Sequence, residues 1–132
     1  RAPLMARILV IDDEELILRT LKGALEAAGY DVVTARDGKQ GLARLREQEF
    51  DLIVTDIIMP QMEGIETIRE IRRTAPDIPI IAASGGGQLG RERLLGMSVA
   101  LGATASIAKP FRPRDLIALI ERHLPEGAGR QA

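Results

Sequence analysis

The chain has 132 residues, a length typical of one domain, and its 45% hydrophobic content is enough to fill one core. It has 18 basic and 19 acidic residues and no cysteine, which excludes thiolate chemistry and argues against direct nucleic-acid binding. No apolar run approaches the roughly 18 residues of a membrane-spanning helix, so we expect a cytoplasmic protein without membrane contact.

Short apolar runs alternate with amphipathic stretches along the whole chain. In chain order they predict a strand at 7–11, a helix at 14–28, a strand at 30–35, a helix at 39–48, a strand at 50–55, a helix at 63–74, a strand at 78–83, a helix at 91–101, a strand at 104–108 and a helix at 113–124. This places one domain at 7–124, preceded by an N-terminal extension or expression remnant at 1–6 and followed by a flexible tail at 125–132.

Strict alternation of five strands with five helices predicts an α/β fold, a doubly wound parallel sheet covered by helices on both faces. The strands are apolar throughout because both faces of such a sheet are buried. In this fold class the functional site lies at the carboxyl ends of the strands, where the strand order reverses. We therefore expect the chemistry of this chain to follow its strands.

Charged and polar side chains do occur at these strand ends. Asp12 and Asp13 follow the first strand, Asp56 ends the third, Ser84 follows the fourth and Lys109 the fifth. Three carboxylates in one crevice repel each other unless a cation joins them, and an all-oxygen donor set suits Mg²⁺, or Mn²⁺. We expect Asp13 to bind such an ion directly and Asp12 to act through water or as an orienting group.

The same residues could perform a phosphoryl transfer. A carboxylate can attack phosphorus to form an acyl phosphate, with Asp56, on a central strand, as the nucleophile. Lys109 would bind a phosphoryl oxygen and the Ser84 hydroxyl would donate a hydrogen bond to another. The alternative for Asp12 and Asp13 is that they cap the helix that follows them.

Four segments carry a resemblance to the receiver domains of two-component response regulators, in particular to single-domain chemotaxis regulators. They are Ile8-Leu-Val-Ile-Asp-Asp-Glu14, Asp51-Leu-Ile-Val-Thr-Asp-Ile-Ile-Met-Pro60 with Gly64, Ile80-Ile-Ala-Ala-Ser84 and Lys109-Pro110-Phe111. The resemblance implies a flavodoxin-like strand order 2-1-3-4-5, with Asp56 as the phospho-acceptor. It also implies a metal bound by Asp12, Asp13, Asp56 and the backbone carbonyl of Ile58, and a cis peptide bond before Pro110.

The resemblance further implies a phosphoprotein in a phosphorelay. Its partners would be a histidine kinase or histidine phosphotransfer domain, which donates the phosphoryl group, and a downstream protein or a missing output domain. Homodimerisation through the last two helices stays open. The chain would not be an enzyme beyond slow self-catalysed phosphorylation and dephosphorylation.

One departure from the family concerns the switch. The family has Tyr or Phe three residues before the lysine, where this chain has Ser106. Ser84 and Ser106 would then form the switch, or loop order would replace it, with the glycine-rich segment 85–90 mobile. Ser106 also supports an alternative, a pseudo-receiver that binds partners without phosphorylation.

Two other functions are less well supported. Residues 85–90 have the form G-x-G-x-x-G, but the dinucleotide fingerprint belongs to a first strand and needs an acid about 20 residues further on. An aspartyl-phosphate phosphatase commonly has a second Asp two residues after the nucleophile, where this chain has Ile58.

Overall fold

The computed structural model describes residues 5–57, 63–84, 96, 99–100, 102–125 and 128. Five strands are present: β1 (Arg7–Ile11), β2 (Asp31–Ala35), β3 (Leu52–Asp56), β4 (Ile80–Ser84) and β5 (Ala105–Ala108). Four helices lie within the described residues: α1 (Glu15–Ala27), α2 (Gly38–Glu47), α3 (Glu63–Thr74) and α5 (Pro113–His123).

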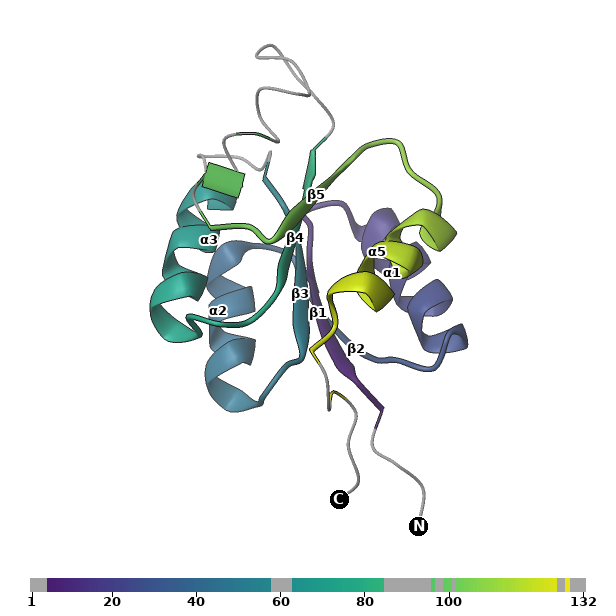
Figure 1. Cartoon of the computed structure of the whole chain (residues 1–132), viewed down its shortest axis with the longest axis horizontal. Helices are drawn as coiled ribbons and strands as arrows, with labels where there is room; N and C mark the ends of the chain where they lie inside the picture. The colour runs from purple at the N-terminus through teal and green to yellow at the C-terminus, as the bar shows by residue number, and fades with distance from the viewer. Residues whose placement is uncertain are drawn as a thin grey trace.

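The strands form one parallel sheet in the order β2-β1-β3-β4-β5, with α2 and α3 on one face and α1 and α5 on the other (Figure 1). The predicted doubly wound topology and strand order are therefore confirmed. Five helices were expected, and four are complete within the described residues. The predicted helix at 91–101 falls largely outside them, although Gly96, Val99 and Ala100 are helical.

Alternate residues of each central strand enter opposite halves of the core. In β1, Leu9 and Ile11 pack with α2 and α3, whereas Ile8 and Val10 pack with α1 and α5. β3 and β4 follow the same alternation, and their residues are all buried. Two apolar layers therefore hold the sheet, which explains why these strands are continuous apolar runs in the sequence.

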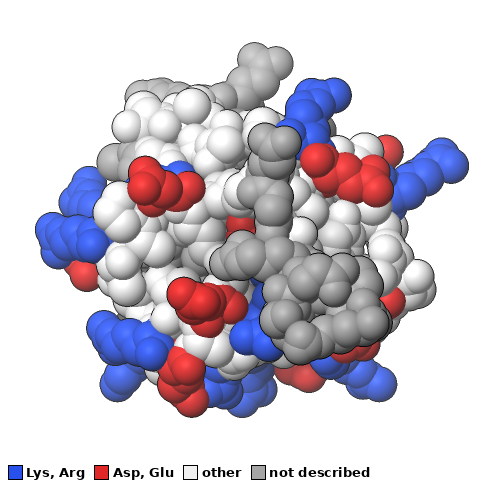
Figure 2. Space-filling view, turned by 60° about the horizontal axis from the view of Figure 1, so that its bottom comes forward, with Lys and Arg blue, Asp and Glu red and all other residues white. Residues whose placement is uncertain are grey.

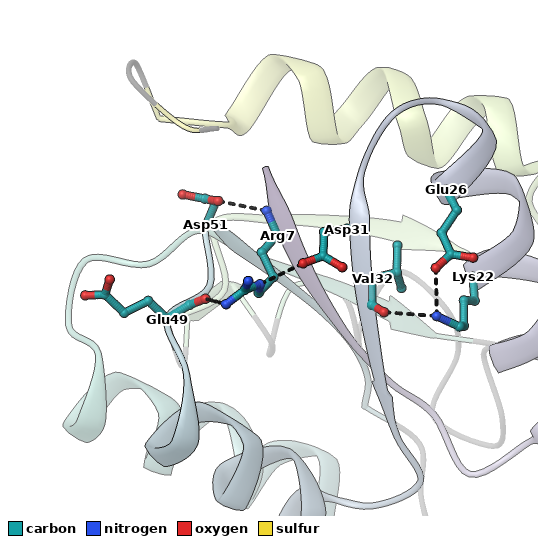
Figure 3. A network of polar contacts seen from close by, with 7 residues as sticks. All are labelled: Arg7, Lys22, Glu26, Asp31, Val32, Glu49 and Asp51. Atoms are coloured by element: carbon teal, nitrogen blue, oxygen red, sulfur yellow. Dashed lines mark hydrogen bonds and ion pairs between the residues drawn. The ribbon is translucent and has the colours of Figure 1, made fainter. Parts of the chain in front are cut away.

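Arg7 joins three strands at the end of the sheet where they begin (Figure 3). Its backbone N–H donates to the Asp51 carboxylate at 2.8 Å, and its Nε donates to the Asp31 carboxylate at 2.9 Å. The guanidinium also contacts the Glu49 carbonyl oxygen at 3.5 Å. These contacts align the amino ends of β1, β2 and β3, far from the end at which the strands stop.

Charges of both signs cover the face at the amino ends of the strands. Figure 2 shows Lys and Arg side chains interspersed with Asp and Glu side chains on this side, without a continuous basic area among the coloured residues. Among the described residues, no helix combines the length and the apolar character needed to cross a bilayer.

Candidate functional site

The carboxyl ends of β1 and β3 meet at the point where the strand order reverses. After β1 the chain passes outward to β2 and then returns to the other side of β1 to form β3. Asp12 directly follows β1, and Asp56 is the last residue of β3. The adjacent strands β4 and β5 end at Ser84 and immediately before Lys109. The topology therefore delivers all of these side chains to one edge of the sheet.

Asp12, Asp13 and Asp56 form a cluster in which one carboxylate oxygen of each lies within 4.8 Å of those of the others. Asp12 and Asp56 are 3% and 4% exposed, whereas Asp13 is open to solvent. Buried carboxylates at this separation need a cation, and the donors are oxygen atoms only. The chemistry of this donor set fits a hard divalent cation such as Mg²⁺, with the open side at Asp13 free for water.

Lys109 supplies a cation from within the protein. Its Nζ donates a hydrogen bond to Asp12 at 2.8 Å and forms an ion pair with Asp56 at 3.4 Å. Burial alone would lower the pKa of Lys109, but the hydrogen bonds and charges of Asp12 and Asp56 outweigh burial and raise this pKa. The ammonium group is therefore charged at neutral pH and lies between the two buried acids.

Asp12 has both of its carboxylate oxygens engaged. One accepts from Lys109, and the other accepts the backbone N–H of Glu14 at 2.9 Å. Glu14 is the residue that precedes α1, and its own side chain makes no capping hydrogen bond. Asp12 thus binds the backbone ahead of the helix rather than the first-turn N–H groups, so the capping alternative does not describe it. An orienting role fits this geometry.

Ser84 and Ser106 lie on β4 and β5, the last two strands in the order of the sheet. Ser84 is completely buried at the end of β4, and its carbonyl oxygen accepts the N–H of Lys109 at 2.8 Å. Ser106 lies within β5, opposite Ala82, and is partly exposed. The structure thus places Ser84 next to Lys109, and Ser106 further back along the edge strand.

The remaining predicted features have different outcomes. The peptide bond between Lys109 and Pro110 is cis, as expected. Ile58, whose backbone carbonyl was expected to bind the metal, and the glycine-rich segment 85–90 lie outside the described residues.

A groove of about 410 Å³ beside Lys109 was not predicted. Its lining residues come from α1 and from the segment between β5 and α5: Leu16, Ile17, Thr20, Leu21, Lys109, Pro110, Phe111 and Pro113. Leu16 is 75% exposed, although it is a large apolar residue. The signal in the sequence was that Leu16 falls outside the apolar stripe formed by Ile17, Leu21 and Leu25.

Comparison with known proteins defines the class to which this fold and site belong. The family model described as the response regulator receiver domain matches residues 8–121. The chain therefore belongs to the receiver domain family of two-component response regulators, which are signalling domains.

The curated relatives include bacterial transcriptional regulators. The chain is 37% identical over 115 residues to the alkaline phosphatase synthesis transcriptional regulatory protein PhoP of Bacillus subtilis, covering 87% of this chain and 47% of that protein. It is also 37% identical over 116 residues to the transcriptional regulatory protein CpxR of Escherichia coli K12, covering 88% and 48%. The chain spans about half the length of these curated relatives.

Solved structures agree over nearly the whole chain. The chemotaxis protein CheY4 of Vibrio cholerae matches with a TM-score of 0.81 and 34% identity, covering 91% of this chain and 99% of CheY4. A CheY-like receiver domain protein of Methanospirillum hungatei matches with a TM-score of 0.81 and 36% identity, covering 89% and 92%. This chain thus has the flavodoxin-like architecture of CheY-like receivers.

Proposed function

We propose that this receiver domain, residues 7–124, accepts a phosphoryl group on Asp56 from a histidine kinase or a histidine phosphotransfer domain in the cytoplasm. The observation that carries this proposal is the meeting of three carboxylates and one ammonium group at the ends of β1, β3 and β5. A site with this charge pattern can hold both a divalent cation and the oxygens of a phosphoryl group.

Each residue has a distinct part in the proposed transfer. A carboxylate oxygen of Asp56 attacks phosphorus, the bond from phosphorus to the donor imidazole breaks, and its electron pair returns to the nitrogen. Lys109 then exchanges its contact with Asp56 for one with a phosphoryl oxygen, which is possible because its Nζ already lies 3.4 Å from that carboxylate. The Ser84 hydroxyl would donate to another phosphoryl oxygen.

The metal would be held by Asp12, Asp13, Asp56 and, by family resemblance, the backbone carbonyl of Ile58. Bound Mg²⁺, or Mn²⁺, supplies positive charge that neutralises the phosphoryl oxygens during transfer. Asp12 keeps its orientation through the N–H of Glu14 at 2.9 Å. Asp13 is open to solvent, so an ion bound there can retain water ligands, as Mg²⁺ requires.

A protein donor would cover the groove beside Lys109. The donor histidine must come within bonding reach of Asp56, so the protein that carries it has to lie over this edge of the sheet. Leu16 and Phe111 line the groove here, and Leu16 is too exposed to serve the core. Burial of such an apolar residue in a complex would contribute to affinity.

Output would lie with another protein or with a further domain, because the curated relatives include transcriptional regulators of about twice the matched length. The domain itself would turn over slowly, since position 58, two residues after Asp56, is an isoleucine and supplies no general acid. The near balance of 18 basic and 19 acidic residues favours a protein partner over nucleic acid or a membrane.

The test is incubation with beryllofluoride and Mg²⁺, which together mimic a phosphoryl group on an aspartate. Wild type is expected to form an adduct, visible as a rise in melting temperature and as shifts in the NMR spectrum. Asp56→Asn should form none, while the surface variant Asp77→Asn should behave like wild type. A folded wild type that forms no adduct would refute the proposal, and partner binding unchanged in Asp56→Asn would favour the pseudo-receiver alternative.

A further inference from the structure

Arg72, in the last turn of α3, connects two loops that lie at the amino ends of β4 and β5. Its Nε donates to the carbonyl oxygen of Gly102 at 2.8 Å, and its Nη2 donates to the Thr104 hydroxyl at 3.3 Å. Its Nη1 donates to three carbonyl oxygens in the loop between α3 and β4, those of Ala75, Pro76 and Ile78. The Arg72 side chain thus hydrogen-bonds both to the segment that leads into β4 and to the segment that leads into β5.

Gly102 lets the guanidinium come this close. Its φ of +121° is unfavourable for other residues, and a Cβ built on it would lie 3.0 Å from Cγ of Arg72. Thr104 then links the arginine to the sheet. Its N–H donates to the Ile80 carbonyl at 2.7 Å, and its hydroxyl accepts the Ile80 N–H at 3.0 Å. Arg72 therefore fixes the start of β5 against the start of β4.

Packing against the core holds the short edge strand β5 only in part. It has four residues, Ala105, Ser106, Ile107 and Ala108, and all of them are partly exposed. Ala105 and Ile107 pack against the core beside α1 and α5, but Ile107 is the one large apolar side chain of the four, so packing contributes only modestly to the register of this edge strand. The Arg72 contacts hold its amino end, and the hydrogen bond from the Lys109 N–H to the Ser84 carbonyl holds its carboxyl end.

We propose that Arg72 is a positioning residue for Lys109. Arg72 fixes the amino end of β5, and the position of this strand determines where Lys109 lies just after its carboxyl end. This inference rests on the function proposed above, because it concerns the residue expected to bind the phosphoryl group. A slip of one residue along a strand moves the chain by roughly 3.3 Å. The contacts of Lys109 with Asp12 and Asp56 span only 2.8 and 3.4 Å, so a displacement of that size would break them.

The test compares Arg72→Met with Arg73→Met. Methionine keeps an apolar stem at position 72 but removes all five hydrogen bonds. Arg73 is the adjacent arginine, is exposed, and pairs with Glu70 of its own helix, so its variant is the matched control. The readouts are the hydrogen exchange rate of the Lys109 amide and the Kd for beryllofluoride at saturating Mg²⁺, at a temperature where all proteins are folded.

We expect Arg72→Met to speed exchange at Lys109 and to weaken beryllofluoride binding by about tenfold, equivalent to roughly 1.4 kcal/mol. Arg73→Met should change neither. A lower melting temperature with wild-type exchange and wild-type Kd would overturn the proposal, because a structural role alone predicts that result.

A second pair of variants keeps the test decisive if Arg72→Met does not fold. Thr104→Val removes the hydroxyl that joins Arg72 to β4, and Thr104→Ser restores it. The valine variant should reproduce the changes at Lys109 and the serine variant should rescue them; equal behaviour of the two would also overturn the proposal. If wild type does not bind beryllofluoride, the proposed function fails, while the exchange rates still decide the role of Arg72.

Discussion

Asp12 and Lys109 are 97 positions apart in the chain, and their side chains meet in a hydrogen-bonded ion pair of 2.8 Å. The pair is largely buried, with side-chain exposures of 4% for Asp12 and 16% for Lys109. Lys109 also reaches Asp56, so a single ammonium group offsets the repulsion between two buried carboxylates. Occupation of the site by a metal ion would take over part of this role.

Replacement of Lys109 by methionine should show how much the stability of the fold depends on the ammonium group between the two buried carboxylates. With chelator present, Lys109→Met is expected to lower the free energy of unfolding by about 3–5 kcal/mol, because two buried carboxylates lose their cation. Saturating Mg²⁺ should recover much of the loss by binding the same oxygens. Urea unfolding with and without Mg²⁺ measures both values.

Lys22→Met is the control for that experiment. Lys22 forms an exposed pair with Glu26 in α1, which should contribute at most about 1 kcal/mol and should not respond to Mg²⁺. If Lys109→Met loses the same unfolding free energy in chelator and in Mg²⁺, the ion does not replace the charge of Lys109 at the two carboxylates, and the interpretation is wrong.

Three glycines should respond differently to alanine because their surroundings differ. Gly23→Ala, on the exposed side of α1 with no atom within 4 Å, should raise stability by about 0.5–1 kcal/mol. Gly29→Ala, at φ +100° in open space, should lower it by about 1–2 kcal/mol. Gly102→Ala should lower it further, since the added methyl group also displaces Arg72. Equal losses at Gly29 and Gly102 in thermal unfolding would argue against the close contact with Arg72.

The ionisation of Tyr30 should be shifted upward. Burial, and after it the charge of Glu121, raise the pKa of Tyr30 above its ordinary value of 10.0. Tyr30 is the single tyrosine in a chain without tryptophan, so the near-ultraviolet absorbance of tyrosinate reports it directly. Glu121→Gln should lower the pKa but leave it above 10.0, because burial is the larger cause.

The raised pKa of Tyr30 also determines how the stability of the folded protein changes with pH. The folded protein holds the Tyr30 proton more tightly than the unfolded chain does. The resulting stabilisation is fully present below the unfolded pKa and is lost as the pH rises through the folded pKa. A titration midpoint at or below 10.0 in the folded protein would contradict the assignment.

Leu16 should affect a protein donor but not a small one. Leu16→Ala is expected to slow phosphoryl transfer from a phosphorylated histidine phosphotransfer domain by about tenfold, since a leucine side chain would no longer be buried in the complex. Labelling by acetyl phosphate should stay at the wild-type rate. Met5→Ala is the matched control, because Met5 is also an exposed apolar residue but precedes β1, at the opposite end of the sheet. Equal effects of the two variants, or a slower reaction with acetyl phosphate, would rule out a docking role.

Much of the fold could be predicted from the sequence because its strands are buried on both faces. Such strands are continuous apolar runs, so β1 was placed at its observed bounds and the other four within two residues at each end. The observed bounds of β3 and β4 lie one or two residues later than the predicted bounds. Strand pairing begins at Leu52 and Ile80, and it includes Asp56 and Ser84 as the last residues of these strands. The edge at which polar residues gather also followed from the topology alone.

Tertiary structure was needed for everything that depends on side-chain contact. The sequence by itself determined that acids and a lysine follow parallel strands, since connectivity brings strand ends to one edge. Only the packed structure decided that Lys109 lies nearer to Asp12 than to Asp56, that Leu16 borders a groove, and that Arg72 fixes the start of β5. The physical reason is that these distances are set by the packing of helices from distant parts of the chain, which local patterns of apolar and polar residues do not encode.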